Sequence, residues 1–247
     1  MVLALIFVFG LVFGSFISAL SWRYPKDISI VKGRSFCPKC KKQIAWYDNI
    51  PLLSFLLLRG KCRNCNRRIS WRYPAIELAS GLGFIFIYTY LASKGFPLQN
   101  QVIYLILFVI LLSIFVIDLE NQIIPDSFIF AGLFVSLFLN NNLLFLNLIA
   151  GFLAATLLLL INLFTKGRGM GLGDVKFAVL GGFLVGLKLL PVWLFLAFLT
   201  GAAVGIILIL GKYAHLKSQI AFGPFLVVAI PLALLYGEKI LFWLHFN

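Results

Sequence analysis

Long uncharged apolar runs alternate with short polar stretches along this chain of 247 residues. A helix needs about 20 apolar residues to cross a bilayer, and most of the runs approach that length. Inside a bilayer the backbone must form its hydrogen bonds within each segment, so the runs predict helices. The alternating pattern typical of membrane β-strands is absent from the sequence. The chain is therefore expected to be an all-α polytopic membrane protein.

About eight transmembrane helices fit the pattern. They are expected at residues 2–21, 76–93, 101–118, 126–139, 143–165, 174–187, 190–211 and 220–242. Residues 127–165 form an uncharged stretch of 39 residues, which exceeds one span, and the three asparagines at 140–142 divide it. The sixth span is the weakest prediction, because it is short and contains Gly181 and Gly182.

The positive charges are concentrated in one loop. Thirteen of the 21 Lys and Arg residues, in a chain of net charge +13, lie within residues 23–72. Nucleic-acid binding is one explanation of this charge, but the positive-inside rule favours a cytoplasmic loop, which can also touch anionic lipid headgroups. This orientation puts 18 cations inside and 3 outside, with both termini outside. The first span lacks a preceding basic region, so a retained helix is expected and not a signal peptide.

All four cysteines lie in that loop. They are Cys37, Cys40, Cys62 and Cys65, in the pairs "CPKC" and "CRNC". Two C-x2-C pairs are typical of a structural Zn²⁺ site, and four sulfurs leave no open position for catalysis. Disulfides are the alternative, but they fit a reducing cytosol poorly. Between the pairs, the apolar residues 52–58 are too short to cross, so they lie on the membrane surface or pack under the zinc site.

Two acids are predicted to face each other at the mouths of spans, where acids are candidates for function. Asp118 ends the third span and Asp174 opens the sixth, both at the inner face. Asp174 follows the four glycines of "GRGMGLG", which permit close backbone approach. Two neighbouring carboxylates can share a proton and activate water as acid and base. The alternative role of Asp174 is that of an N-terminal acid on its helix.

The remaining titratable residues have simpler explanations. Glu77 is expected to cap a helix or form an ion pair, Glu120 to be solvated, and Asp126 to occupy a helix N-terminus. The two histidines, His215 and His245, fall on opposite sides in this topology, so no Ser-His-Asp or Cys-His set is available.

Three stretches carry a resemblance that covers nearly the whole chain. They are "CPKCKKQIAWYDNIPLLSFLLLRGKCRNCNRRISWRYPAIEL", "IDLENQIIPD" and "GMGLGDVK", the last with a G-x-G-D signature. In these the chain resembles the bacterial type IV prepilin leader peptidases, which also serve type II secretion. The resemblance implies an inner-membrane aspartyl protease that cuts prepilins or pseudopilins after a glycine, at the cytoplasmic face. It maps the catalytic pair onto Asp118 and Asp174, with Asp126 as the nearest alternative.

The resemblance also implies a second activity. Many members methylate the new N-terminal residue with S-adenosylmethionine, and the tetracysteine pattern accompanies them. Gly60 of "RGKC" is associated with methyl transfer. Two alternatives stay open, namely a protease without methyl transfer and a non-catalytic, zinc-stabilised scaffold or transporter. A transporter should show inverted repeats or helices broken at the midplane; no clear repeat is visible, and the acids cluster at one interface.

The predicted organisation has three parts. They are a first transmembrane helix (1–21), a cytoplasmic tetracysteine zinc domain (22–74) and a seven-helix membrane aspartyl protease domain (75–247).

Overall fold

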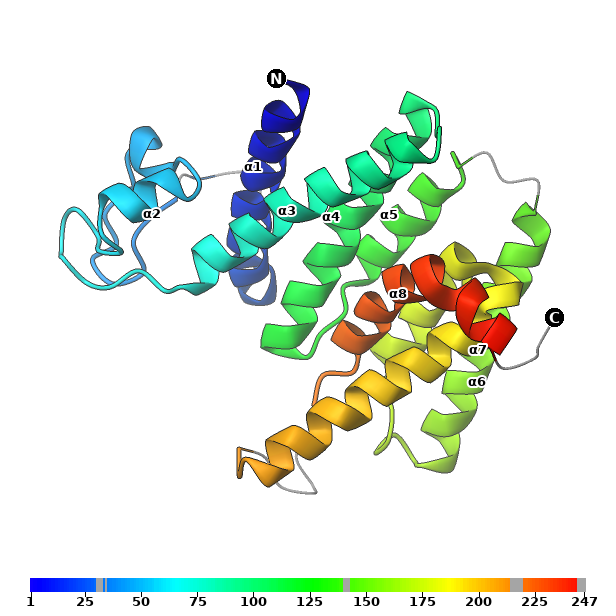
Figure 1. The fold of residues 1–247 in the computed structure, drawn as a ribbon. Coiled ribbons are helices and arrows are strands. Elements are labelled where there is room, and N and C mark those ends of the chain that lie inside the picture. Colours follow the sequence, from blue (N-terminus) through cyan, green and yellow to red (C-terminus); the bar gives the residue numbers. More distant parts are fainter. Residues whose placement is uncertain (30–32, 34, 140–142, 214–219, 244–247) are drawn as a thin grey trace. The chain divides into compact units, whose positions relative to one another are not determined.

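A computed structural model describes the chain except for residues 30–32, 34, 140–142, 214–219 and 244–247. The described residues contain no strand, only helices and two isolated β-bridges. Among the described residues, six helices are long and apolar enough to cross a membrane: α1 (Val2–Arg23), α3 (Arg72–Ser93), α4 (Leu98–Asn121), α6 (Leu144–Phe164), α7 (Leu172–Leu210) and α8 (Gly223–Trp243) (Figure 1). The prediction of an all-α polytopic membrane protein is therefore confirmed.

The expected count of eight spans is not confirmed. The fourth expected span is the short helix α5 (Asp126–Ser136), which has 11 residues, and the sixth and seventh lie within the single element α7. The asparagines at 140–142, which were expected to separate the fourth span from the fifth, lie outside the described residues.

Helix α7 nevertheless folds back on itself. Gly186 interrupts it with the non-helical dihedrals φ 76° and ψ 168°. A Cβ atom on Gly181 would lie 2.3 Å from Cζ2 of Trp193, whereas residues 12 positions apart in a straight helix lie about 18 Å apart. The chain therefore reverses at Gly186, within the last two residues of the predicted span 174–187.

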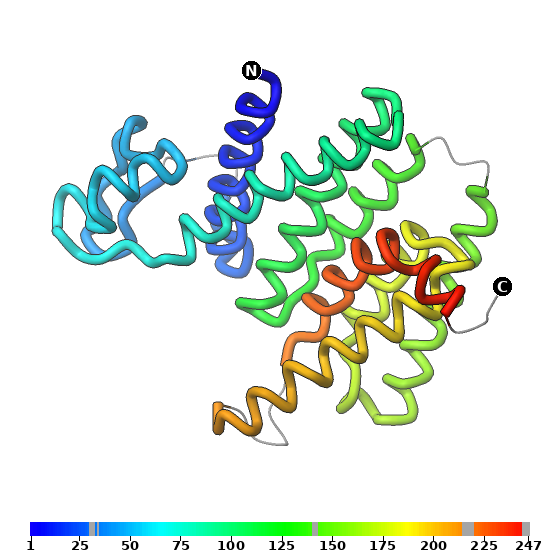
Figure 2. Tube along the Cα trace, in the orientation of Figure 1, coloured from blue at the N-terminus to red at the C-terminus, as the bar shows by residue number. Residues whose placement is uncertain are grey.

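The chain divides into two compact units, Met1–Val116 and Ile117–Asn247. In the first unit α1 packs along α3, as the tube in Figure 2 also shows. A Cβ on Gly14 would lie 2.6 Å from the Cα of Glu77, so glycine is needed for this close approach. The described part of the segment between α1 and α3 holds two 3-10 turns, η1 (Tyr24–Lys26) and η2 (Trp46–Asn49), and the short helix α2 (Leu53–Leu57).

In the second unit α7 packs against α5, α6 and α8. A Cβ on Gly151 would lie 2.5 Å from the Val179 carbonyl oxygen, so α6 and α7 are in backbone contact. The Trp193 side chain is fully buried, and its Nε1–H donates to the Leu226 carbonyl at 3.0 Å. These contacts join α6, α7 and α8 in one body.

Candidate functional site

Asp118 lies in the last turn of α4, with 4% of its surface exposed. It faces the first residue of α8, because a Cβ on Gly223 would lie 2.5 Å from its Oδ2 atom. The backbone N–H of Gly223 hydrogen-bonds to the Asp118 carboxylate. Oδ2 is buried and has no hydrogen-bond partner among the described residues. Buried polar atoms are rarely left in this state, so this oxygen can receive a donor from a bound molecule.

Asp174 lies in the first turn of α7, with 8% of its surface exposed. Its Oδ2 accepts the backbone N–H of Gly171, the N-cap residue, at 3.2 Å. Asp174 therefore also acts as an N-terminal acid of its helix, which is the alternative role that the sequence suggested. Gly167 adopts φ 76° in the preceding loop, a conformation that favours glycine.

The two carboxylates occupy one small region of the second unit. Ile124 contacts the surroundings of both, since Cβ atoms on Gly173 and Gly223 would lie 3.3 Å and 2.9 Å from its side chain. Asp118 is also close enough to act electrostatically on Asp174. Two acids 56 positions apart in the sequence thus meet where α4 ends and where α7 and α8 begin. Their catalytic role remains a prediction.

Asp126, the nearest alternative, is engaged elsewhere. Its carboxylate forms an ion pair with Lys176 Nζ at 2.8 Å, and both side chains are about half exposed. Sequence reasoning did not single out Gly223 or Ile124. Gly223 lies outside the quoted motifs, and Ile124 lies within "IDLENQIIPD" only as an apolar residue, so their contacts with the acids are visible only in the tertiary packing.

The four cysteines form a compact cluster in the first unit. Their Sγ atoms all lie within 4.8 Å of one another, and those of Cys37 and Cys65 are 3.9 Å apart. Four thiolates at about 2.3 Å from a tetrahedral Zn²⁺ would be about 3.8 Å apart, so the donor set fits this ion. None of the four cysteines forms a disulfide.

Two similar turns present the cysteine pairs. In the first, the Lys41 N–H donates to the Cys37 carbonyl at 2.8 Å, and in the second the Asn66 N–H donates to the Cys62 carbonyl at 2.9 Å. Lys41 and Asn66, each directly after its pair, have φ of 58° and 53°. Burial opposes the thiolate form of Cys37, but hydrogen bonds from the backbone of Cys40 and Lys39 outweigh it and lower the Cys37 pKa to about 7. The thiolate is the form that binds a metal.

An ion pair joins the second turn to the chain between the pairs. Arg63 donates from Nε and from its second terminal nitrogen to the two carboxylate oxygens of Asp48, at 2.8 Å and 2.7 Å. These hydrogen bonds lower the pKa of Asp48. The bidentate contact favours one orientation of the second cysteine turn relative to η2.

Gly60 lies in the turn after α2. It adopts φ 66°, its N–H donates to the Phe55 carbonyl at 2.8 Å, and a Cβ would lie 3.2 Å from the Phe55 ring. The turn itself accounts for a glycine, and a role in binding a methyl donor remains a prediction. The two histidines of the sequence analysis lie outside the described residues.

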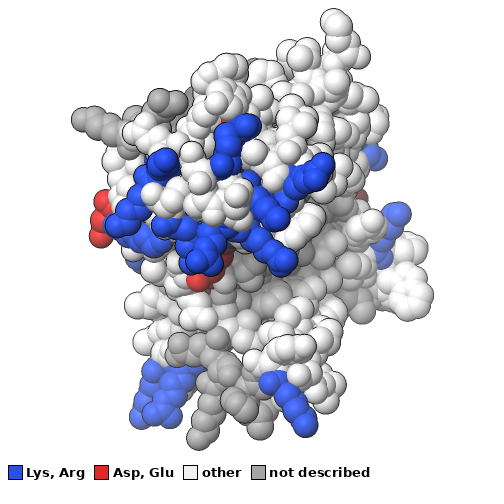
Figure 3. Space-filling view, turned by 90° about the vertical axis from the view of Figure 1, so that its left-hand side faces the viewer, with Lys and Arg blue, Asp and Glu red and all other residues white. Residues whose placement is uncertain are grey.

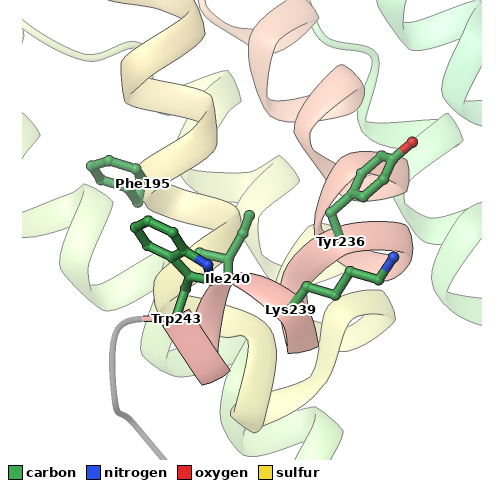
Figure 4. A pocket seen from close by; sticks show the side chains of 5 residues that line it. All are labelled: Phe195, Tyr236, Lys239, Ile240 and Trp243. Atoms are coloured by element: carbon green, nitrogen blue, oxygen red, sulfur yellow. The ribbon is translucent and has the colours of Figure 1, made fainter.

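A mostly apolar groove lies between the second half of α7 and the end of α8. It is lined by Phe195, Tyr236, Lys239, Ile240 and Trp243, with Phe195 next to Trp243 and with Tyr236 and Lys239 on the other side (Figure 4). None of the predicted site residues lines this groove, so it does not belong to the aspartate site.

Comparison with known proteins assigns both halves of the chain. Residues 8–91 match the "Bacterial Peptidase A24 N-terminal domain", and residues 105–206 match the "Type IV leader peptidase family". No solved structure matches the chain.

Several curated relatives share one name, "Prepilin leader peptidase/N-methyltransferase". The relative from Stutzerimonas stutzeri is 37% identical over 215 residues, which is 83% of this chain and 73% of the relative. That from Aeromonas hydrophila is 33% identical, covering 97% of this chain and 92% of the relative. The relative from Bacillus subtilis is 33% identical, covering 97% of this chain and 96% of the relative. The helices and these matches define an integral membrane protein of a peptidase class. The chain belongs to the type IV leader peptidase family.

Proposed function

We propose that the protein is a membrane aspartyl endopeptidase and N-methyltransferase that acts on type IV prepilins or pseudopilins. It removes their basic leader after a glycine and then methylates the new N-terminal residue. The observation that carries the peptidase proposal is the burial of Asp118 and Asp174 in one region, inside the stretch that matches the leader peptidase family. The shared name of the relatives supports both activities and the substrate class.

In the proposed mechanism the two aspartates hold a water molecule between them. The ionised carboxylate takes a proton from the water, whose oxygen attacks the scissile carbonyl carbon. The protonated partner donates to the carbonyl oxygen, and a proton then passes to the leaving amine as the peptide bond breaks. General acid–base catalysis of this kind contributes roughly 10²–10⁴-fold, and the pair titrates as one coupled unit. The backbone N–H groups of Gly223 and Gly171 orient the two acids.

The aspartates are proposed to lie at the cytoplasmic face of the inner membrane, with both termini outside. The distribution of charge supports this orientation. The chain must cross the bilayer an even number of times between Asp118 and Asp174, because the two acids meet. Helices α5 and α6 supply such a pair of crossings, and the two halves of α7 supply the pair between Asp174 and Gly223. Eight passes then follow, although α5 covers only about 17 Å as a helix and requires locally thinned lipid.

The cysteine cluster is proposed to hold one structural Zn²⁺. With four thiolate ligands the ion has no open position, so it stabilises a segment too small to rely on a hydrophobic core. The methyl donor is proposed to be S-adenosylmethionine, which supplies an activated methyl group when it is bound. Gly60 is the residue proposed for this activity.

The aspartate proposal is tested with purified enzyme in lipid and a prepilin substrate, using mass spectrometry to follow the cut and the methyl group. Asp118→Asn and Asp174→Asn should each lower the cleavage rate by at least about 10³-fold, because the two acids act as a unit. The matched control is Asp126→Asn, which should cleave within about twofold of wild type, because an exposed ion pair contributes little.

If the wild type cuts and both pair variants still cut, the aspartate mechanism is wrong. If the folded wild type neither cuts nor methylates, the alternative of a scaffold or transporter replaces the proposal.

A further inference from the structure

The segment between α1 and α3 exposes large apolar side chains on one side of α2. Leu53, Leu56 and Leu57 have positions i, i+3 and i+4, which share a face of the helix, and their exposed fractions are 48%, 70% and 73%. Trp71 is 76% exposed. The centroid of its ring lies 4.9 Å from that of the Phe55 ring, and Phe55 belongs to α2. We call these four side chains, Leu53, Leu56, Leu57 and Trp71, the α2 ridge. A cluster of this kind marks a surface that contacts another apolar phase.

Two contacts fix the height of α2 along α3. The Leu52 N–H, at the start of α2, donates to Glu77 Oε2 at 2.8 Å. Glu77 is 7% exposed and is the sixth residue of α3, so it lies about 7.5 Å along that helix. Trp71 directly precedes the first residue of α3. The α2 ridge is therefore held beside the first turns of a helix long enough to span the membrane.

At this position along α3, the α2 ridge is level with the boundary between headgroups and acyl chains. Amphipathic helices on membranes bury their apolar face about 5–10 Å into the region between headgroups and acyl chains. Tryptophan is also enriched at this boundary. Since α3 enters the membrane at its first residues, the α2 ridge reaches the same region from the side.

Exposed cations lie close to the ridge in the sequence. Arg59 and Lys61 are the second and fourth residues after α2. Figure 3, seen from the side on which this segment lies in Figure 1, shows Lys and Arg side chains gathered on that surface. Anionic headgroups attract such a surface, whereas the basic leader of the proposed substrate is repelled by it. The charge therefore favours lipid as the occupant.

We propose that the α2 ridge is a lipid-binding surface that lies in the headgroup–acyl boundary, with its flanking cations on anionic headgroups. The cysteine segment is then held flat against the membrane from which α1 and α3 emerge. The proposal rests on α1 and α3 crossing the bilayer, as their length and composition allow. It does not depend on the chemistry at the aspartate pair.

The test uses the full chain, reconstituted in vesicles of phosphatidylglycerol and phosphatidylcholine. The photoreactive residue p-benzoylphenylalanine replaces Leu56 in one variant. In the matched control it replaces Asn66, which is also exposed and lies in the second cysteine turn. After illumination, mass spectrometry identifies the cross-linked partner. We expect lipid adducts at position 56 in at least about tenfold excess over position 66.

Equal lipid yields at the two positions would overturn the proposal. So would preferential cross-linking of position 56 to an added prepilin peptide, which would make the ridge a substrate surface. In vesicles of phosphatidylcholine alone, the yield at position 56 should fall at least twofold, and an unchanged yield would refute the role given to the cations. The zinc content of each variant shows whether the cysteine segment is folded, and prepilin cleavage, measured separately, shows whether the proposed peptidase function holds.

Discussion

Gly223 determines where the carboxylate of Asp118 can lie. The Gly223→Ala substitution would place a Cβ 2.5 Å from Asp118 Oδ2 and 2.9 Å from Ile124 Cδ1, so the acid must move. Because a displacement of about 1 Å at a catalytic group costs about 10²-fold, prepilin cleavage should fall by that factor while the fold is retained. Steady-state cleavage kinetics and a thermal unfolding midpoint measure the two effects.

The control for this prediction is Gly205→Ala on α7, where the nearest atom to the new Cβ would be Ile220 Cδ1 at 3.9 Å. It should cleave at the wild-type rate. A Gly223→Ala enzyme as active as this control would show that the position of Asp118 is not critical to catalysis.

Sequence alone identified some candidate residues and missed others for a physical reason. Asp118, Asp174 and the four cysteines stand in short motifs, in which the spacing of charged or sulfur ligands carries chemical meaning. The structure brings the two acids together and gathers the four sulfurs. Gly223 stands in no such motif, and Ile124 stands in the motif of Asp118 without a charge or a ligand atom that would mark it. Their place beside the acids depends on how α8 and the turn after α4 pack, and one sequence does not encode this packing locally.

At the scale of elements, the apolar pattern located the helices well but not their geometry. The predicted spans 174–187 and 190–211 placed a break after residue 187, and the chain reverses at Gly186. Several glycines in this region could have supplied the break, and only the backbone shows that Gly186 has a positive φ. In the same way, the pattern predicted a 14-residue span at 126–139, whereas α5 ends at Ser136.

Any side chain at position 186 should destabilise the reversal of the chain there. The Gly186 dihedrals of φ 76° and ψ 168° fall in a region that is essentially restricted to glycine, and a Cβ would lie 3.0 Å from Asn147 Oδ1. Gly186→Ala should lower the free energy of unfolding by about 1–3 kcal/mol, measured by denaturant or steric-trap unfolding in lipid. The Gly205→Ala variant, on the regular helix after the reversal, should be at least as stable as wild type. Equal stability of the two variants would argue against the reversal.

The cysteine segment should depend on its metal. Metal binding and folding are one equilibrium in small zinc domains, so Cys40→Ser or treatment with a strong chelator should release one Zn²⁺ per chain. Residues 36–69 should then become sensitive to protease. Because Asp118 and Asp174 lie in the other compact unit, prepilin cleavage should persist. Elemental analysis and limited proteolysis test this prediction, and a purified chain without zinc whose segment resists protease would contradict it.

At the scale of the whole molecule, the meeting of the two aspartates constrains the path through the membrane. The end of α4, the start of α7 and the start of α8 share one site, so the intervening segments must leave that face and return. A short α5 and a reversed α7 allow the return. Helix α5 is shorter than an ordinary span and α7 is interrupted at Gly186, yet crossings at both follow from placing the two acids at one face.

The same reasoning predicts the sidedness of three exposed turns. Gly33, Gly95 and Gly167 all have positive φ and open space around them, so each should tolerate a short inserted epitope. Four crossings, including α5, separate Gly33 from Gly167, and one separates Gly33 from Gly95. Epitopes at Gly33 and Gly167 should therefore react with antibody only in permeabilised spheroplasts, and an epitope at Gly95 in intact ones. With 18 of 21 cations assigned to the inner side, the reverse orientation would violate the positive-inside rule. Opposite sides for Gly33 and Gly167 would mean that α5 does not cross, and the eight-pass arrangement would be wrong.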